Sequence, residues 1–197
     1  MKLSIKSTIL AMFILFSTQY ASADAFKKYK QHDKYDRYFK KYSKRFFGAG
    51  FDWQLFKAQA IAESNLRPDA KSYVGAQGLM QIMPRTYQEI IGKNKFIEGA
   101  ATEPKSSIAA GIYYDRQKWN IWKSDRPLLD RLKFMFASYN AGAQNIINAQ
   151  KKAKEKTGLE ANTWQPVADN LKAITGDHSI ETINYVDKIF IILEDIN

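Results

Sequence analysis

Aromatic and basic residues are interleaved in the first clearly periodic segment of the chain. The aromatic side chains recur at steps of three and four residues, at Tyr35, Tyr38, Phe39, Tyr42 and Phe46. That spacing places them on one stripe of an amphipathic helix. Basic residues mixed with aromatics also occur where proteins stack on nucleic-acid bases, but the helical spacing favours a packed stripe. We therefore predict that residues 24–50 form a basic, aromatic N-terminal helix that packs on the rest of the protein.

A second helix is predicted over residues 53–63, and it carries a carboxylate on its apolar face. Phe56, Ala60 and Glu63 fall at positions i, i+4 and i+7, so they share one side of the helix. Burial and the negative end of the helix dipole both raise the pKa of such a carboxyl. A raised pKa suits a general acid that works near neutral pH. The alternative is a structural ion pair with the basic residues that follow, Arg67 or Lys71.

The rest of the pattern is also helical. Pro84 is well placed as the first residue of a helix, and residues 92–105 look like a surface loop. Further helices are predicted over residues 107–122, 127–139, 143–156 and 181–194. Residues 162–178 are polar and rich in turn-forming residues, which predicts a loop with one short helix. No alternating strand pattern is visible, so residues 51–197 are expected to form a single, mainly α domain.

The first 23 residues have the pattern of a secretory signal peptide. Lys2 and Lys6 precede a nearly continuous apolar run from Thr8 to Phe16, and Ala21-Ser22-Ala23 fits a cleavage site. The apolar run is short for a membrane-spanning helix, although an uncleaved anchor is the alternative interpretation. We therefore expect cleavage after Ala23 and export to the periplasm.

The charge and the composition narrow the classes of partner and chemistry. The net charge is +10, and it becomes +8 once Lys2 and Lys6 are removed with the signal peptide. A positive surface favours polyanions, and an exported protein meets the anionic cell wall or membrane surface rather than nucleic acid. The chain has no cysteine, which excludes disulfides and thiolate chemistry, and its two histidines lie far apart. We expect neither a metal site nor a cofactor.

Four short motifs follow one another in the chain. They are Ala58–Ser64 (AQAIAES), Gly75–Pro84 (GAQGLMQIMP), Ala137–Gly142 (ASYNAG) and Glu181–Val186 (ETINYV). Each motif is weak alone, but together they place one carboxylic acid, a glycine-hinged apolar loop and a Tyr/Asn pair in one small domain. These are parts with which an enzyme can protonate a glycosidic bond.

At these motifs the chain resembles the catalytic domain of bacterial lytic transglycosylases. The resemblance covers residues 51–193 and is to the soluble lytic transglycosylase family, which is related in fold to goose-type lysozyme. The approach over residues 35–53 is most similar to the membrane-bound F-type subgroup. The resemblance implies a lysozyme-like helical domain with a catalytic groove, and peptidoglycan glycan strands as the substrate.

The resemblance also implies a mechanism with Glu63 as the sole acid/base. Glu63 would protonate the oxygen that leaves C1 of N-acetylmuramic acid in the β-1,4 bond to N-acetylglucosamine. The 2-acetamido oxygen of the same sugar would attack C1. Glu63 would then take the proton of the C6 hydroxyl, which closes on C1 and yields a 1,6-anhydro end without consuming water.

The resemblance implies roles for residues in the first two motifs and between them. Ser64 would support Glu63, and Ser72 would contact the glycan near the cleavage point. Gln81 and Met83 would line the groove. Of the two methionines in the second motif, one is expected to point into the core and the other towards the groove.

Further roles are implied for the later motifs. Tyr139 would hold the acetamido group or the catalytic acid through its hydroxyl, and Asn140 would shape the end of its helix. Glu181 and Tyr185 lie one helical turn apart and would close the far side of the groove. Tyr114 is expected in the core rather than on a surface that stacks on sugars.

Two other functions remain open from the sequence. A hydrolytic muramidase on the same fold would deliver water, and an inverting hydrolase would need a second carboxylate about 6.5–9.5 Å from the first. No motif marks one, and Asp69 follows Pro68 in a predicted turn. A catalytically inactive wall-binding or assembly protein is disfavoured because Glu63 and its companions are intact. The small size favours a local role, such as service to a wall-spanning secretion or conjugation apparatus, and the oligomeric state is open.

Overall fold

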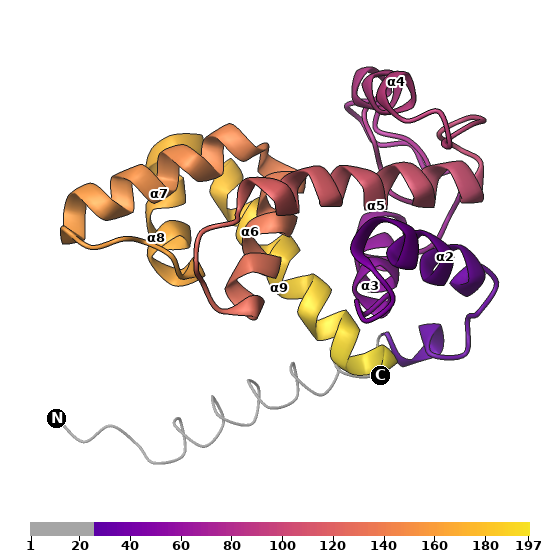
Figure 1. Ribbon diagram of the computed structural model, residues 1–197, viewed down its shortest axis with the longest axis horizontal. Helices are drawn as coiled ribbons and strands as arrows, with labels where there is room; N and C mark the ends of the chain where they lie inside the picture. The colour runs from indigo at the N-terminus through magenta and orange to yellow at the C-terminus, as the bar shows by residue number, and fades with distance from the viewer. Residues whose placement is uncertain (1–25) are drawn as a thin grey trace, which may run out of the picture.

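The computed structural model describes residues 26–197, and these residues are helical, as predicted (Figure 1). The only β-type pairing in this range is two isolated bridges, which join Gln77 to Lys71 and to Ile82. The predicted signal peptide lies outside the described residues and stays a prediction. The elements are η1 (Lys27–Tyr29), α2 (Asp36–Phe47), α3 (Gln54–Ser64), α4 (Pro84–Lys93), α5 (Pro104–Ile121), α6 (Leu128–Ala141), α7 (Ala143–Thr157), α8 (Trp164–Thr175) and α9 (His178–Ile196).

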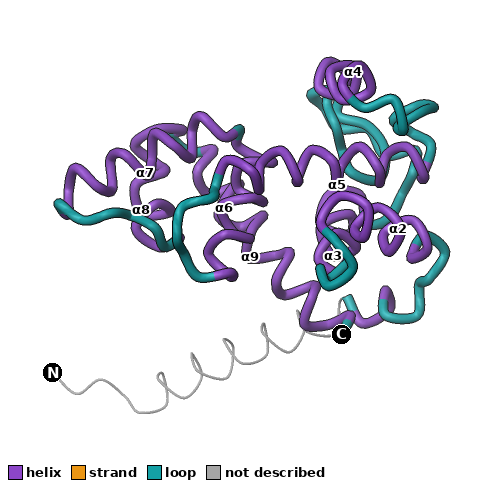
Figure 2. Tube along the Cα trace, viewed as in Figure 1, coloured by secondary structure: helices purple, strands orange, loops and turns teal. Residues whose placement is uncertain are grey.

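Two long helices, α5 and α9, connect two groups of shorter elements. On one side lie η1, α2, α3 and α4, and on the other lie α6, α7 and α8 (Figure 1). Helix α5 packs against α2, α4 and α6, while α9 packs against α3, α6 and α8. The loops that join α3 to α4 and α4 to α5 lie together beside α4 (Figure 2). The two long helices therefore hold α3, the α3–α4 loop and the end of α6 in one frame.

The aromatic stripe of α2 packs on the domain, as the helical spacing predicted. Phe39 and Tyr42 are buried, and Tyr38 and Phe46 are partly buried against the core. An ion pair of 2.9 Å between Asp36 and Lys57 further joins α2 to α3.

The segment at 162–178 is more helical than the sequence predicted. It contains α8, a helix of 12 residues that fills most of the segment, rather than a loop with one short helix. Trp164, Val167, Ala168 and Leu171 form its buried stripe at positions i, i+3, i+4 and i+7. Polar residues separate these four side chains and give the segment the composition of a loop, so composition was a poorer guide here than spacing. The N-terminal helix is also shorter than the predicted range of residues 24–50, because η1 and a loop precede α2, which begins at Asp36. The remaining predicted helices lie within a few residues of the observed ones.

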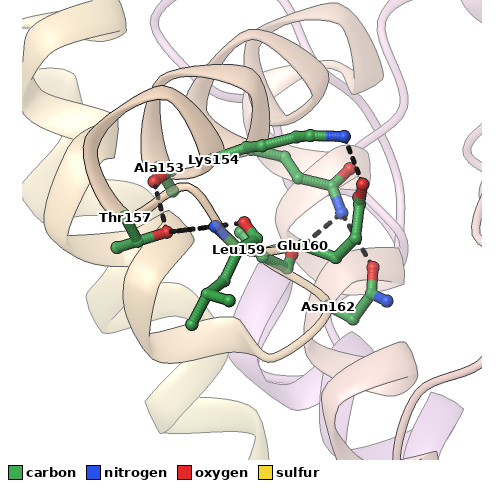
Figure 3. A network of polar contacts seen from close by, with 8 residues as sticks. Ala153, Lys154, Thr157, Leu159, Glu160 and Asn162 are labelled. Atoms are coloured by element: carbon green, nitrogen blue, oxygen red, sulfur yellow. Dashed lines mark hydrogen bonds and ion pairs between the residues drawn. The ribbon is translucent and has the colours of Figure 1, made fainter.

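The turn between α7 and α8 is held by side chains at the basic end of α7 (Figure 3). The Thr157 hydroxyl lies 3.0 Å from the carbonyl oxygen of Ala153 and accepts a bond of 3.3 Å from the backbone N–H of Leu159. Lys154 forms an ion pair with Glu160 across the turn. These polar contacts close α7 and turn the chain back, so that α8 packs against α7.

Candidate active site

A groove of about 500 Å³ opens where the end of α3, the α3–α4 loop, α5, α6 and the start of α9 meet. A second hollow of about 340 Å³ adjoins it and extends towards α8, with Asn140, Ala141 and Glu181 common to both. The groove is lined by Glu63, Ser72, Val74, Ala76, Gln81, Ile82, Met83, Thr86, Tyr114, Tyr139, Asn140, Ala141, Gly142 and Glu181.

Glu63 lies at the C-terminal end of α3 with its carboxyl partly exposed to the groove. Burial is the main reason that its pKa rises from 4.5 to about 7. The hydrogen bond from Tyr185 and the nearby charge of Lys188 lower this pKa, and the charge of Glu181 raises it. The Tyr185 hydroxyl donates to Oε1 of Glu63 at 2.6 Å. The upward shift expected from the sequence is therefore present.

The alternative interpretation of Glu63 as a structural ion pair is wrong. The Arg67 guanidinium turns back and donates to the carbonyl oxygen of Ser64 at 3.2 Å. Among residues 26–197 no basic side chain lies within ion-pairing distance of the Glu63 carboxylate. The left-handed conformation of Asn65 and Leu66, with φ of 54° and 58°, ends α3 and turns the chain away just beyond the carboxyl.

Tyr185 lies beneath the groove rather than on its far side, which corrects the sequence-based assignment. Its side chain is buried, and its hydroxyl accepts a bond of 3.2 Å from Nε2 of Gln59 while it donates to Glu63. Glu181, one turn earlier on α9, is exposed and does line the groove. The two residues share a side of α9, but the packing of α9 on α3 buries only the later one.

Ser64 is also buried, and it does not line the groove. Its hydroxyl lies 2.8 Å from the carbonyl oxygen of Leu79 and 3.1 Å from that of Ala60. This contact ties the end of α3 to the loop that forms the groove wall. Any support that Ser64 gives to Glu63 therefore acts through the position of this loop.

The α3–α4 loop is braced from within by Gln81. Its amide donates to the carbonyl oxygens of Ala70 at 3.1 Å and Gly78 at 2.9 Å, while the residue also lines the groove. Gly78 has φ of +77°, and a Cβ there would lie 2.0 Å from the carbonyl oxygen of Ala101, so only glycine fits. Ser72 lines the groove and its hydroxyl accepts from the N–H of Ala76 at 2.9 Å.

The two methionines point in opposite directions, as predicted. Met80 is fully buried, and Met83 is 42% exposed on the groove wall. Gly111 on α5 makes room for Met80, because a Cβ at Gly111 would lie 2.6 Å from the Met80 side chain.

Tyr139 lines the groove, but its hydroxyl holds the loop and not the acid. It donates to the carbonyl oxygen of Met80 at 2.7 Å. The ring of Tyr114 stands against that of Tyr139, with centroids 5.2 Å apart, and it lines the groove as well. Tyr114 is therefore partly buried against the core, as expected, and it also lines the groove, which was not expected. Asn140 accepts a bond of 2.8 Å from Thr182, which joins the end of α6 to α9.

The family model of the transglycosylase SLT domain matches residues 37–162 of this chain. The chain belongs to this family. The match begins inside α2, ahead of the boundary at residue 51 that the sequence predicted, and it ends before α8.

Relatives of this SLT domain include two proteins named membrane-bound lytic murein transglycosylase F. The one from Maricaulis maris is 30% identical over 68% of this chain and 28% of its own length. The one from Stutzerimonas stutzeri is 31% identical over 79% of this chain and 30% of its own length. The lytic transglycosylase Slt from Pseudomonas aeruginosa, solved as an inactive mutant, has a TM-score of 0.62 at 25% identity, covering 82% of this chain and 23% of that protein. The chain thus spans less than a third of the length of these proteins.

The SLT domain also contains a fully buried acidic residue that the sequence analysis did not identify. Asp115 on α5 is fully buried, and burial raises its pKa well above the usual range, with a further increase from the charge of Glu63. Its Oδ1 lies 3.3 Å from Nε2 of Gln59. A signal was present in the sequence, because Ile108, Ile112, Asp115 and Trp119 follow one helical stripe and all four are buried.

Within residues 26–197 of the chain, no group of three or more His, Cys, Asp or Glu side chains could hold a metal ion. No helix in that range is long and apolar enough to cross a membrane.

Proposed function

We propose that this chain is a peptidoglycan lytic transglycosylase. It cleaves the β-1,4 bond between N-acetylmuramic acid and N-acetylglucosamine and leaves 1,6-anhydro ends, with Glu63 as the acid and base. The observation that carries the proposal is the Glu63 carboxyl itself, which faces the groove, receives a hydrogen bond from Tyr185 and has a pKa raised to about 7 by burial.

A carboxyl with this pKa can serve both proton transfers of the reaction. Near neutral pH a large share of Glu63 is protonated and can donate to the leaving oxygen, and the carboxylate that remains can accept the C6 hydroxyl proton. A substrate that supplies its own acetamido oxygen as the nucleophile removes the need for a second catalytic carboxylate.

The comparisons support this proposal. The curated relatives bear the name lytic murein transglycosylase. The Pseudomonas aeruginosa enzyme was made inactive by replacing a glutamate with glutamine, which is the change that removes a general acid while it preserves shape.

Hydrolysis is the second candidate, and Glu181 is the observation that favours it. Its exposed carboxylate lines the same groove as Glu63 and its charge contributes to the raised pKa of Glu63. A hydrolase needs a second carboxylate in the groove as the base that activates water. A substitution at Glu181 can therefore distinguish hydrolysis from the transglycosylase reaction.

The test is digestion of purified peptidoglycan in ¹⁸O-water followed by mass spectrometry of the muropeptides. We expect 1,6-anhydro ends without solvent oxygen, and a rate loss of about 10² to 10⁴ in Glu63→Gln. Glu181→Gln, the same change at the other acidic residue of the groove, should leave the product unchanged. Reducing ends labelled with ¹⁸O that disappear in Glu181→Gln would establish hydrolysis instead. Wall binding without any cleavage would favour the inactive wall-binding or assembly protein.

We further propose that the protein acts outside the cytoplasm, after cleavage of residues 1–23. Residues 24–50, which include α2, then form its N-terminal segment, and residues 51–197 form the catalytic domain. The amino-terminal pattern of charge and hydrophobicity supports export to the periplasm, as do relatives that are named as membrane-bound murein enzymes. Local opening of the wall for a secretion or conjugation apparatus fits this small domain. An exported protein whose amino-terminal sequence begins at Asp24 would support the processing step, and retention of Met1 would contradict it.

A further inference from the structure

Asp115 is a buried carboxyl for which the proposed reaction has no use. It does not line the groove, and its Oδ2 has no hydrogen-bond partner among the described residues. Burial of an acidic group without a full set of partners is costly, so such a group calls for an explanation. Its one partner is the amide of Gln59, on the helix that carries Glu63.

A chain of hydrogen bonds leads from Asp115 to the catalytic acid. Nε2 of Gln59 lies 3.3 Å from Asp115 Oδ1 and 3.2 Å from the Tyr185 hydroxyl, and that hydroxyl lies 2.6 Å from Oε1 of Glu63. An amide nitrogen only donates, so the Tyr185 oxygen accepts from Gln59 and its single hydrogen goes to Glu63. Because Oε1 of Glu63 takes this bond, the proton that Glu63 gives to the substrate is carried by Oε2.

The surroundings of Asp115 favour its neutral form. Burial raises the pKa of Asp115 most strongly, and the charge of Glu63 adds to the increase, whereas the bond from Gln59 and the charge of Lys118 oppose it. The other ionisable groups beside it are the phenols of Tyr139 and Tyr185, whose pKa values are themselves raised by burial. A neutral Asp115 with its proton on Oδ2 keeps Oδ1 free to accept from Gln59.

We propose that Asp115 is a positioning residue: by accepting from Gln59 it fixes the orientation of that amide, which commits the Tyr185 hydrogen to Glu63. Without an acceptor at position 115, the Gln59 amide can turn its oxygen towards Tyr185, and this oxygen then competes with Glu63 for the hydrogen. The effect on cleavage rests on the function proposed above, whereas the hydrogen-bond chain itself does not.

Two substitutions separate the acceptor from the charge. Asp115→Leu removes the acceptor and weakens a bond that lowers the pKa of Glu63, so we expect that pKa to rise. The basic limb of the kcat/KM profile should move to higher pH, and kcat should fall roughly tenfold with KM unchanged. Asp115→Asn keeps a neutral acceptor, so the basic limb of its kcat/KM profile should lie at the same pH as in the wild type. Tyr185→Phe should shift the limb as Asp115→Leu does, and the double variant should shift it no further.

Ile112→Val is the matched control, because Ile112 lies on the same buried stripe of α5 but outside the hydrogen-bond chain. It should lose stability without any shift of the limb. If Asp115→Leu fails to fold, Asp115→Ala is the second variant without an acceptor.

The readout that does not depend on activity is a ¹³C NMR titration of the glutamate carboxyls, with the Glu63 signal identified by its loss in Glu63→Gln. It reports the pKa of Glu63 even in a protein that cleaves nothing, so a failure of the proposed function is seen separately. A wild-type titration of Glu63 in Asp115→Leu or Asp115→Ala would reduce Asp115 to a packing residue and overturn the proposal. A shift in Asp115→Asn as large as that in Asp115→Leu would overturn the neutral acceptor. A shift of the Glu63 pKa in Asp115→Leu or Asp115→Ala, but not in Asp115→Asn, would support the proposal.

Discussion

Replacing Glu63 by glutamine should stabilise the folded protein above neutral pH. The folded state raises the pKa of this carboxyl from 4.5 to about 7, mainly because burial disfavours its charged form. Between these two values the unfolded chain has lost a proton that the folded chain still holds. The free energy of unfolding of the wild type therefore falls as the pH rises from about 4.5 to 7, and it is level on either side of this window for this group. Glutamine does not titrate, so the Glu63→Gln variant does not show this fall in the free energy of unfolding.

The size of the step follows from the pKa difference. A rise from 4.5 to about 7 corresponds to about 3 kcal/mol at 1.36 kcal/mol for each pH unit. Because Glu63 is partly exposed to the groove, solvent reduces this value, and we expect a gain of about 2–3 kcal/mol at pH 8 and almost none at pH 4. Glutamine keeps an oxygen that can accept from Tyr185, so the hydrogen bond should persist in the variant.

Urea unfolding of wild type and Glu63→Gln at pH values from 4 to 8 measures this difference. Glu155→Gln, the same change at an exposed site on α7, is the control and should show no gain that depends on pH. Asp115 is present in all three proteins, so its own contribution largely cancels. A stability difference between wild type and Glu63→Gln that is the same at pH 4 and pH 8 would refute the reasoning. It would mean that ionisation of Glu63 does not destabilise the folded state.

Two further predictions concern the groove wall. Tyr139→Phe leaves the carbonyl oxygen of Met80 without its donor, which should cost about 1–3 kcal/mol in urea unfolding and slow cleavage without changing the product; slower cleavage at full stability would instead place the hydroxyl on the substrate. Gly111→Ala puts a methyl group 2.6 Å from Met80, which should cost about 1–3 kcal/mol. An unchanged urea midpoint for Gly111→Ala would show that Met80 moves aside freely.

The helical fold could largely be predicted from residue spacing, because a buried stripe recurs with the period of a helix wherever one helix packs on another. The stripe from Tyr35 to Phe46 and the helix that carries Glu63 are both predicted in this way. The helix at Trp164–Thr175 is longer than the short helix predicted for this segment, because polar composition hides a buried stripe of helical period.

The sequence by itself determined the family and the groove-lining motifs, and it singled out Glu63 as the proposed acid, since these depend on residue types in a fixed order. It also identified Met83, Gln81 and Glu181 as residues of the groove. Only the tertiary structure decided which polar atoms meet. It turned Tyr139 towards a loop carbonyl, buried Tyr185 beneath Glu63 and brought Asp115 into the same hydrogen-bond chain. The reason is physical: hydrogen bonds act over about 3 Å, and α3, α5, α6 and α9 bring side chains that are far apart in sequence within that distance only when they pack.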